Sequence, residues 1–518
     1  MEKSHNKFIV FFTALVMALG LYAAPAGAVS NSASPVAERV LSVEIEEATI
    51  FELQHAMQKE GLTSEELVQF YLNQIEEYDD SINSIITVDE NVLEEAKKLD
   101  KERKAGKVRG PLHGIPVILK DNYDTYDMQT TAGSLSLEGS IPLKDAYQTK
   151  RLRDQGAIIL GKANLHEFAF GFQTISSLGG QTYNPYDLTR YPGGSSGGTA
   201  AAVASNFATV GLGTDTGGSI RIPSSFNNLV GLRPTMGLAS RDGIIPLALS
   251  QDVGGPLGRT VEDVAVVLDA IAGYDPADPV TEASIGKVPK TYTHYLKKNG
   301  LKKARIGVIR DLFGNDPEVN KVMDQVIADM EALGAEVFEV TVPSLRPILS
   351  YPSLSGFEFK FQLNDYLASL GPDAPVRTLA DIIESGKFHP SLESGLKSRN
   401  ERESLENDEE YQDIITHRPK LARESLMVTF NEHDLDALLY PTSSALPAQV
   451  GNSQGAGNAN RLSPYSGFPA ISVPAGFSDN GLPVGLELLG KEFDEPTLIK
   501  LAYAYQEGTN HRKAPELK

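Results

Sequence analysis

The sequence of 518 residues contains no cysteine. This absence excludes disulfide bonds, thiolate metal sites and a lipid-modified cysteine. Hydrophobic residues make up 41% of the sequence, without long low-complexity runs. A chain of this size without disulfides can be stabilised by core packing alone, so we expect a globular protein with a large hydrophobic core.

Basic residues are scarce relative to acidic ones. The sequence has 47 Lys and Arg against 68 Asp and Glu, a net charge of −21, and its basic residues form no sustained block. A surface of this charge repels nucleic acid and anionic lipid. The composition therefore predicts no nucleic-acid partner, and it leaves the oligomeric state open.

The apolar run near the N-terminus is too short to span a bilayer. It covers residues 8–22, which is below the roughly 18 to 20 residues that a membrane-spanning helix needs. Two lysines precede the run, and a small-residue pattern that ends at Ala28 follows it. We predict a bacterial signal peptide over residues 1–28 and a secreted or cell-envelope protein without stable membrane association after cleavage. An uncleaved membrane anchor is the alternative.

Short apolar segments alternate with helical patterns along the chain. The segment PLHGIPVILK (111–120) predicts a strand that ends at Lys120, and DQGAIILGKAN (154–164) predicts another. A β-α-β unit is predicted over residues 304–340, because ARIGVI and AEVFEV flank a helical hydrophobic face. Such units pair strands in parallel. We therefore expect an α/β protein whose sheet is covered by helices on both faces.

A helix is also predicted to begin after Thr63. Thr63 and Glu66 have the spacing of a capping box, and Leu67, Tyr71 and Ile75 then recur at helical spacing. This pattern predicts an amphipathic helix packed on a larger body.

Glycine and serine are concentrated between residues 193 and 231, which suggests that the backbone there approaches something closely. A nucleophile elbow is one hypothesis, because G-x-S-x-G matches around both Ser195 and Ser196, but a Pro-containing segment stands where that motif needs a strand. A phosphate-binding loop at a helix N-terminus is a second hypothesis. Neither a Walker lysine nor the dinucleotide fingerprint accompanies it.

Amide hydrolysis by a serine and a lysine is the third hypothesis. A serine nucleophile must lose a proton, and the departing amine must gain one. A lysine can act as the base when burial lowers its pKa. Lys120, at the end of an apolar strand, is placed for such burial. The neighbouring Asp121 would favour the charged lysine, so we expect its carboxylate to point away from the site.

The motifs of this region resemble those of the amidase signature family. They are Lys120, GGSSGG, GTDTGGSIRIP, GLRPT and SQDVGGPLGRTVEDVA, in the order and spacing of that family. The resemblance begins near Thr63 and includes SPYSGFPAISVPAGF and GLPVGLELLG near the C-terminus; only residues 273–434 look generic. It implies a large mixed central β-sheet, a single amidase domain over residues 29–518 with a signature core at about 100–275, and no metal or organic cofactor.

The resemblance also assigns roles to individual residues. It implies that Ser219 is the nucleophile, that Ser195 follows a cis peptide bond and relays protons, and that Lys120 is the ultimate base. The two serines are 24 positions apart, as in the family. The backbone amides of Thr216, Gly217, Gly218 and Ser219 are expected to form an oxyanion hole.

Further residues are assigned supporting or structural roles. Asp215 and Arg221 are expected to hold the nucleophile loop through a charge pair, and Ser196 is expected to bond either the loop or the relay. Several others fit either a place near the site or ordinary structural contacts: His113, Thr131, Gly133, Ser134 and His166. Arg233, in GLRPT, stands where many relatives have lysine, which puts one local contact in doubt.

The function implied is that of a secreted amidase, which converts a carboxamide to a carboxylic acid and ammonia or an amine through an acyl-Ser219 intermediate. Two alternatives remain: a protein like the A subunit of the amidotransferases, which takes ammonia from glutamine, and a non-catalytic secreted ligand-binding protein. The preferred substrate is a small-molecule or peptide amide, especially a peptide with a C-terminal carboxamide. Tyr351, Phe357, Phe359 and Phe361 are candidates either for an acyl pocket or for the core.

Overall fold

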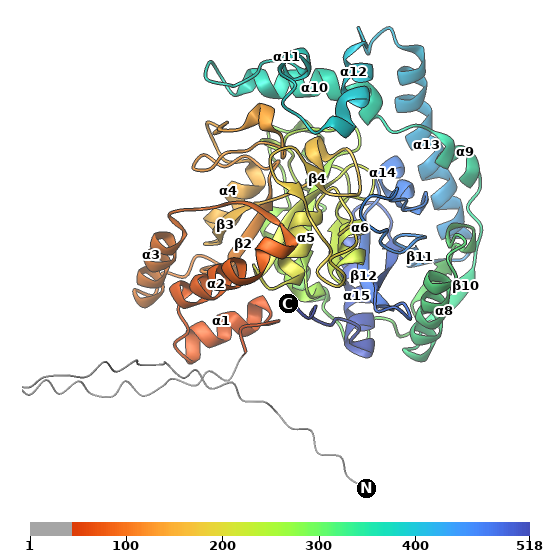
Figure 1. Cartoon of the computed structure of the whole chain (residues 1–518). Helices are drawn as coiled ribbons and strands as arrows, with labels where there is room; N and C mark the ends of the chain where they lie inside the picture. Colours follow the sequence, from red (N-terminus) through yellow and green to blue (C-terminus); the bar gives the residue numbers. More distant parts are fainter. Residues whose placement is uncertain (1–43, 518) are drawn as a thin grey trace, which may run out of the picture. The chain divides into compact units, whose positions relative to one another are not determined.

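A computed structural model describes residues 44–517 of the chain (Figure 1). The predicted signal peptide lies outside the described residues, so its cleavage stays a prediction. None of the described helices is both long and apolar enough to cross a membrane.

One mixed sheet of eleven strands forms the centre of the described structure, in the order β1-β3-β2-β6-β8-β7-β12-β13-β11-β9-β10. Its strands are β1 (Ile85–Val88), β2 (Pro116–Lys120), β3 (Ile158–Ala163), β6 (Val210–Asp215), β7 (Val230–Arg233), β8 (Val253–Gly258), β9 (Arg305–Val308), β10 (Glu336–Glu339), β11 (Ala437–Pro441), β12 (Ala470–Phe477) and β13 (Pro483–Leu489). A separate two-stranded sheet pairs β4 (Ile175–Ser176) with β5 (Gly180–Gln181).

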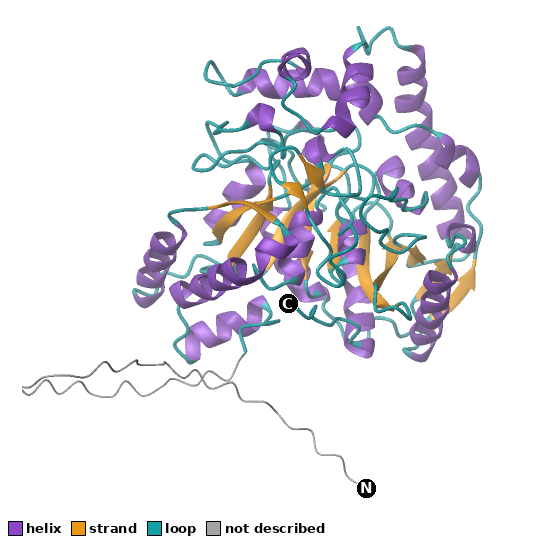
Figure 2. Cartoon of the chain, in the orientation of Figure 1, coloured by secondary structure: helices purple, strands orange, loops and turns teal. Residues whose placement is uncertain are grey.

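Both faces of the large sheet are covered. Every residue of β2, β3 and β6 is buried, and successive side chains of a strand point to opposite faces. Buried strands of this kind require cover on both sides, and Figure 2 shows the strands at the centre with helices around them. The predicted α/β class with a large mixed sheet is confirmed.

Fifteen α-helices surround the sheet in the described part of the chain. They are α1 (Ile50–Lys59), α2 (Ser64–Ile82), α3 (Val92–Lys104), α4 (Tyr147–Asp154), α5 (Gly197–Ala204), α6 (Arg221–Phe226), α7 (Val261–Ile271), α8 (Pro317–Ala332), α9 (Leu345–Ser350), α10 (Ser355–Ser369), α11 (Leu379–Ser385), α12 (Glu393–Asn400), α13 (Glu409–Glu432), α14 (Leu462–Ser466) and α15 (Glu495–Thr509).

Local sequence signals place two of these elements as expected. Thr63 caps α2, and its side chain and that of Glu66 form the predicted capping box. Strands β9 and β10 pair in parallel across α8, as the β-α-β pattern predicted. Local capping and hydrophobic spacing therefore decide the structure here.

The parallel part of the sheet positions the candidate site. β2 pairs in parallel with both β3 and β6, so the carboxyl ends of these three strands meet at one edge. Lys120 ends β2, and Thr214 and Asp215 end β6. Ligands of open α/β sheets bind beyond such carboxyl ends.

Candidate active site

Lys120 lies fully buried where β2 and β6 end. Its Nζ is 2.7 Å from Ser195 Oγ and 2.7 Å from Thr214 Oγ1. Thr214 Oγ1 also accepts a hydrogen bond of 3.1 Å from Asn122 Nδ2. Sequence reasoning missed both residues: Thr214 belongs to the GTDTGGSIRIP motif, and Asn122 lies two positions after Lys120, outside the motifs.

The electrostatics of Lys120 favour a neutral amine. Burial lowers the pKa of Lys120 to about 7, against the attraction of Asp215 and Asp252, which favours the charged form. No ion pair joins Lys120 to a carboxylate among residues 44–517. Lys120 is therefore buried and has a lowered pKa, as the sequence predicted.

Asp121 points away from Lys120, as expected. Its carboxylate accepts hydrogen bonds from the Thr131 hydroxyl and from the Thr131 amide at 3.2 Å, and it lies 3.4 Å from Lys162 Nζ. Lys162 is fully buried as well and donates to Tyr123 O at 2.6 Å and to Thr130 Oγ1 at 2.7 Å. The site region thus contains two buried lysines, and the one that Asp121 neutralises is Lys162.

Ser195 and Ser196 precede helix α5, and the Gly194–Ser195 peptide bond is cis, as expected. The side chains of the two serines point to different partners. Ser195 Oγ meets Lys120, whereas Ser196 Oγ bonds the amide and carbonyl of Thr214, each at 3.3 Å. Ser196 therefore ties the loop to β6.

The glycine-rich loop approaches its neighbours as closely as its composition suggested. A Cβ on Gly198 would lie 2.2 Å from Asn164 O and 2.7 Å from Ser84 O, both backbone atoms. Glycine is required there because backbone atoms cannot move aside as a flexible side chain can.

Ser219 lies in the turn between β6 and α6 and lines a cavity of about 260 Å³. Its Oγ has no hydrogen-bond partner among residues 44–517, so the expected contact with Ser195 Oγ is not formed here. The cavity walls come from five separate segments, which are Ala169 to Phe172, then Thr216, Gly217 and Ser219, then Leu247 and Gln251, then Ser353 and Ser355, and finally Gly457, Asn460, Arg461 and Tyr465.

The amides of the turn from Thr216 to Ser219 fall into two groups. Gly218 N donates to Asp215 Oδ1 at 2.7 Å, so this amide is already engaged and departs from the expected oxyanion role. The amides of Thr216, Gly217 and Ser219 donate to no atom within the described residues. Gly218 instead bends the backbone, at a φ of +121° that favours glycine.

A buried charge network fixes this turn. Asp215 pairs with Arg221 at 3.0 Å and with Arg233 at 3.2 Å, and Arg221 also pairs with Glu487 at 2.6 Å. Burial alone would raise the pKa of Asp215, yet Arg221 and Arg233 hold it well below its ordinary value. Two carboxylates and two guanidinium groups balance one another, which buried charges require.

Arg233, which stands where many relatives have lysine, makes a defined set of local contacts. Its guanidinium donates to Asp215 O and, at 2.8 Å, to Gln251 O in addition to its contact with the carboxylate. A planar fork with several donors fits this arrangement better than a single ammonium group would. Glu487 was missed, because it is 266 positions from Arg221 in the sequence.

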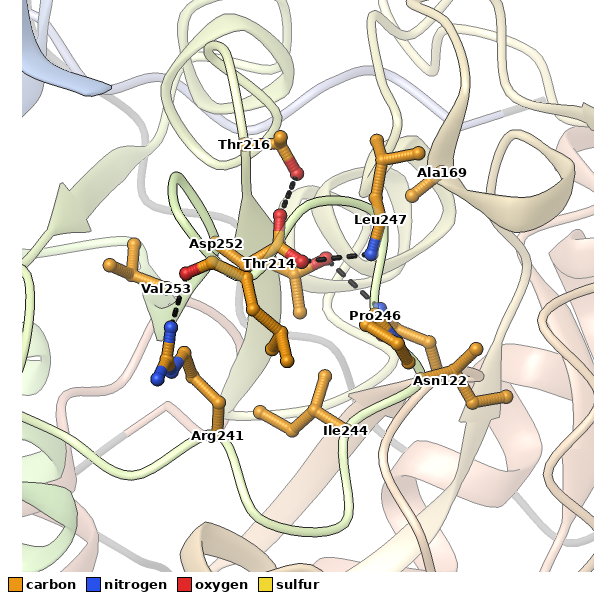
Figure 3. A pocket seen from close by; sticks show the side chains of 12 residues that line it. Asn122, Ala169, Thr214, Thr216, Arg241, Ile244, Pro246, Leu247, Asp252 and Val253 are labelled. Carbon is orange, nitrogen blue, oxygen red and sulfur yellow. Dashed lines mark hydrogen bonds between the residues drawn. The ribbon is translucent and has the colours of Figure 1, made fainter. Parts of the chain in front are cut away.

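Asp252 lies beside Thr216 in the site, and sequence reasoning did not assign it a role. Its carboxylate accepts from the Thr216 hydroxyl at 2.5 Å and from the Leu247 amide at 2.8 Å (Figure 3). It also accepts from the Ala248 amide at 2.8 Å. Asp252 therefore connects the turn from Thr216 to Ser219 to the loop that follows Ile244.

The remaining candidates have structural contacts. His113 bonds Leu99 O at 3.0 Å, and the His166 amide donates to Ser195 O at 3.0 Å. Burial lowers the pKa of His166 to about 4. Gly133 N lies 3.5 Å from the Asp121 carboxylate, and Ser134 caps a short 3-10 helix. These residues support the loops around the site.

The aromatic residues suggested for the acyl pocket lie elsewhere. Phe357 and Phe359 are buried in hydrophobic clusters, and Tyr351 and Phe361 do not line the cavity either. Its aromatic walls are instead Phe170, Phe172 and Tyr465. Within the described residues, the alternative of a core role therefore fits Phe357 and Phe359.

Comparison with known proteins identifies the family. The sequence matches the amidase family over residues 66–499. It is 39% identical to the A subunit of the glutamyl-tRNA(Gln) amidotransferase of Moorella thermoacetica, over 90% of this chain and 98% of that one. The structure resembles the peptide amidase of Stenotrophomonas maltophilia with a TM-score of 0.86 at 39% identity, over 91% of this chain and 99% of that one. The A subunit of the Thermotoga maritima amidotransferase gives a TM-score of 0.71 at 28% identity, over 92% and 99%.

The chain therefore belongs to the amidase family, the amidase signature proteins. It is an enzyme that hydrolyses amides, and not the non-catalytic ligand-binding protein considered from the sequence.

Proposed function

We propose that Ser219 attacks the amide carbonyl, that Ser195 relays its proton, and that neutral Lys120 is the final base. The observation that carries this proposal is the 2.7 Å contact between the buried Lys120 Nζ and Ser195 Oγ. A hydroxyl can accept one proton while it donates another, so Ser195 can connect a lysine to a nucleophile that the lysine does not touch. The Ser195–Ser219 contact is expected to tighten when substrate binds.

Thr214 gives the lysine its orientation in this proposal. A neutral amine has two N–H donors and one lone pair. Because Thr214 Oγ1 accepts from both Asn122 and Lys120, it fixes one N–H of Lys120 and leaves the lone pair for the Ser195 proton. Attack by Ser219 then gives a tetrahedral oxyanion, which the unpaired amides of Thr216, Gly217 and Ser219 can stabilise.

The favoured substrate is a peptide whose C-terminus is a carboxamide. We call the cavity of about 260 Å³ beside Ser219 the large cavity. Among the residues that line it, Arg461 is the only charged side chain, and none is acidic. The α-ammonium of free glutamine would therefore have no carboxylate partner there. A peptide backbone needs only neutral partners, and Asn460 Oδ1 is a buried acceptor without a hydrogen-bond partner in the described structure. The similarity to peptide amidase agrees with this choice, whereas the amidotransferase relatives keep glutamine as the alternative.

A substrate screen tests this choice. We expect purified protein to release ammonia from an N-acetylated dipeptide amide with a kcat/KM at least about tenfold above that for glutamine. This ratio corresponds to the one charge contact that the buried α-ammonium of glutamine would lack. Ammonia release from both is measured at equal enzyme concentration. Release from glutamine alone would replace the proposal by the amidotransferase-like function.

The pH dependence of kcat/KM tests the base. Neutral Lys120 is needed, and the neutral form predominates above its pKa of about 7. With an uncharged peptide amide, we expect kcat/KM to be constant at pH 8 to 9 and to fall about tenfold per pH unit well below 7. Burial raises the pKa of Asp124 to about 7 as well, so Asp124→Asn is the control, and its profile should keep the inflection. A flat profile from pH 9 to pH 5 would contradict the assignment.

We further propose that the enzyme is exported, which rests on the signal-peptide pattern of residues 1–28. Recovery of a mature protein that begins at residue 29 outside the cytoplasm supports the proposal, and a full-length cytoplasmic protein opposes it.

A further inference from the structure

A second and much smaller cavity lies beside the substrate cavity. Its volume is about 10 Å³, and the two cavities share Ala169, Thr216 and Leu247 as walls. The other walls of the small cavity include Asn122, Thr214, Ile244 and Val253 (Figure 3). Ser219 borders the large cavity alone, whereas Thr214 and Asn122 border the small one alone.

The small cavity has the size of one small molecule. A volume of roughly 10 to 15 Å³ for the centre of a water-sized sphere is the minimum that holds one water. Ammonia has nearly the size of water, whereas an N-methyl group adds a carbon that this space cannot take without movement of a wall. The small cavity therefore discriminates by size.

The small cavity also offers a polar partner. Asn122 is 2% exposed, and its Oδ1 accepts no hydrogen bond from the described residues. Its Nδ2 is fixed by the bond to Thr214 Oγ1. A buried acceptor of this kind is costly unless a ligand donates to it. An N–H of a carboxamide or of ammonia, or an O–H of water, can supply that donor.

The proton relay points to the same side of the site. In the proposed mechanism, Ser195 returns a proton to the departing nitrogen, so that nitrogen must face Ser195 and Lys120. Lys120 contacts Thr214, which forms a wall of the small cavity. The acyl part of the substrate then occupies the large cavity beside Ser219, and the nitrogen occupies the small one.

We propose that the small cavity is a leaving-group site, which holds the –NH₂ group of a primary carboxamide, then ammonia, then the water that replaces it. The proposal rests on the proposed function, because it needs an acyl-Ser219 intermediate. In acylation, the Ser219 Oγ–C bond forms, the C–N bond breaks, and the Ser219 proton reaches nitrogen through the relay. In deacylation, a water O–C bond forms, the Ser219 Oγ–C bond breaks, and the water proton returns to Ser219 Oγ. The site selects primary amides over secondary ones.

Enlargement of the small cavity alone tests this selectivity. Ile244→Ala removes carbon atoms from a wall that the large cavity lacks. We expect the ratio of kcat/KM for an N-methyl amide to kcat/KM for the primary amide of the same N-acetylated peptide to rise about tenfold or more, the range that one methylene is worth in a pocket. Ile244→Val should shift it the same way by less, and it serves as the variant if Ile244→Ala does not fold.

Phe172→Ala is the matched control, because Phe172 lines the large cavity only. It is expected to change hydrolysis of both amides alike and to leave their ratio within about twofold of wild type, because the removed ring is a wall of the acyl side. A folded Ile244 variant that hydrolyses the primary amide with an unchanged ratio would overturn the leaving-group site.

The failure of the proposed function would be distinct from the failure of this site. If the Ser219 mechanism is wrong, Ser219→Ala retains hydrolysis of the primary amide whatever the Ile244 variants do. If only the leaving-group site is wrong, Ser219→Ala is inactive and the Ile244 variants keep the wild-type ratio.

Discussion

Replacement of Ser219 by alanine is expected to lower kcat for the primary peptide amide by about 10⁶-fold, the scale of removing a nucleophile that acts together with its base. Thr216 also lines the large cavity, but its hydroxyl donates to the Asp252 carboxylate, whereas the Ser219 hydroxyl bonds no atom of the described residues. Ser353 and Ser355 also line the cavity, but their hydroxyls bond each other and no lysine, histidine or carboxylate of the described residues. The measurement is steady-state ammonia release, with labelling by a fluorophosphonate as a second readout.

Ser196→Ala is the control for this prediction. Ser196 stands one position from the relay serine, but its Oγ bonds only the backbone of Thr214, at 3.3 Å. We expect Ser196→Ala to lose less than about tenfold in kcat, because long neutral hydrogen bonds contribute little. We also expect the fluorophosphonate to label this variant as it labels the wild type. Turnover or labelling that survives in Ser219→Ala and disappears in Ser196→Ala would instead place the nucleophile in the GGSSGG loop.

Local sequence patterns predicted the elements that carry the site. The apolar segment that ends at Lys120 forms strand β2, all five residues of which are buried, and the burial of Lys120 lowers its pKa. The density of glycines predicted close backbone approach, which Gly198 shows against Asn164. Roles for Ser195 and Ser219 required the family resemblance, since spacing in one sequence does not reveal which hydroxyl faces the substrate.

Long-range contacts could not be predicted. Asn460 and Tyr465 reach the cavity from a segment more than 240 positions after Ser219, and Phe170 and Phe172 lie in a stretch of loop with no regular period. Gly218 shows a subtler limit. Its neighbours suggested four converging amides, yet the Asp215 side chain turns back and takes one of them. Side-chain orientation of this kind depends on Arg221, Arg233 and Glu487 together.

Replacement of the two buried lysines by methionine, which preserves length and removes the amine, is expected to affect different properties. At Lys120 it should lower activity, and at Lys162 it should lower stability. Lys120→Met should lower kcat by about 10³-fold or more, because general base catalysis contributes 10²–10⁴-fold and the relay depends on this base. Its free energy of unfolding at pH 8 should remain within about 1 kcal/mol of wild type, since no carboxylate is left unpaired.

Lys162→Met should instead destabilise the fold. Lys162 lies 3.4 Å from the buried Asp121, and its loss leaves that carboxylate without its cation, a change that typically costs about 3 to 5 kcal/mol. The protein that does fold should keep the wild-type dependence of kcat/KM on pH, because the titrating amine of Lys120 is unchanged. Urea unfolding at pH 8 measures the first effect, and ammonia release from pH 5 to 9 measures the second. Destabilisation of Lys120→Met as large as that of Lys162→Met would show that Lys120 is held as a structural cation, which would remove the neutral base from the mechanism.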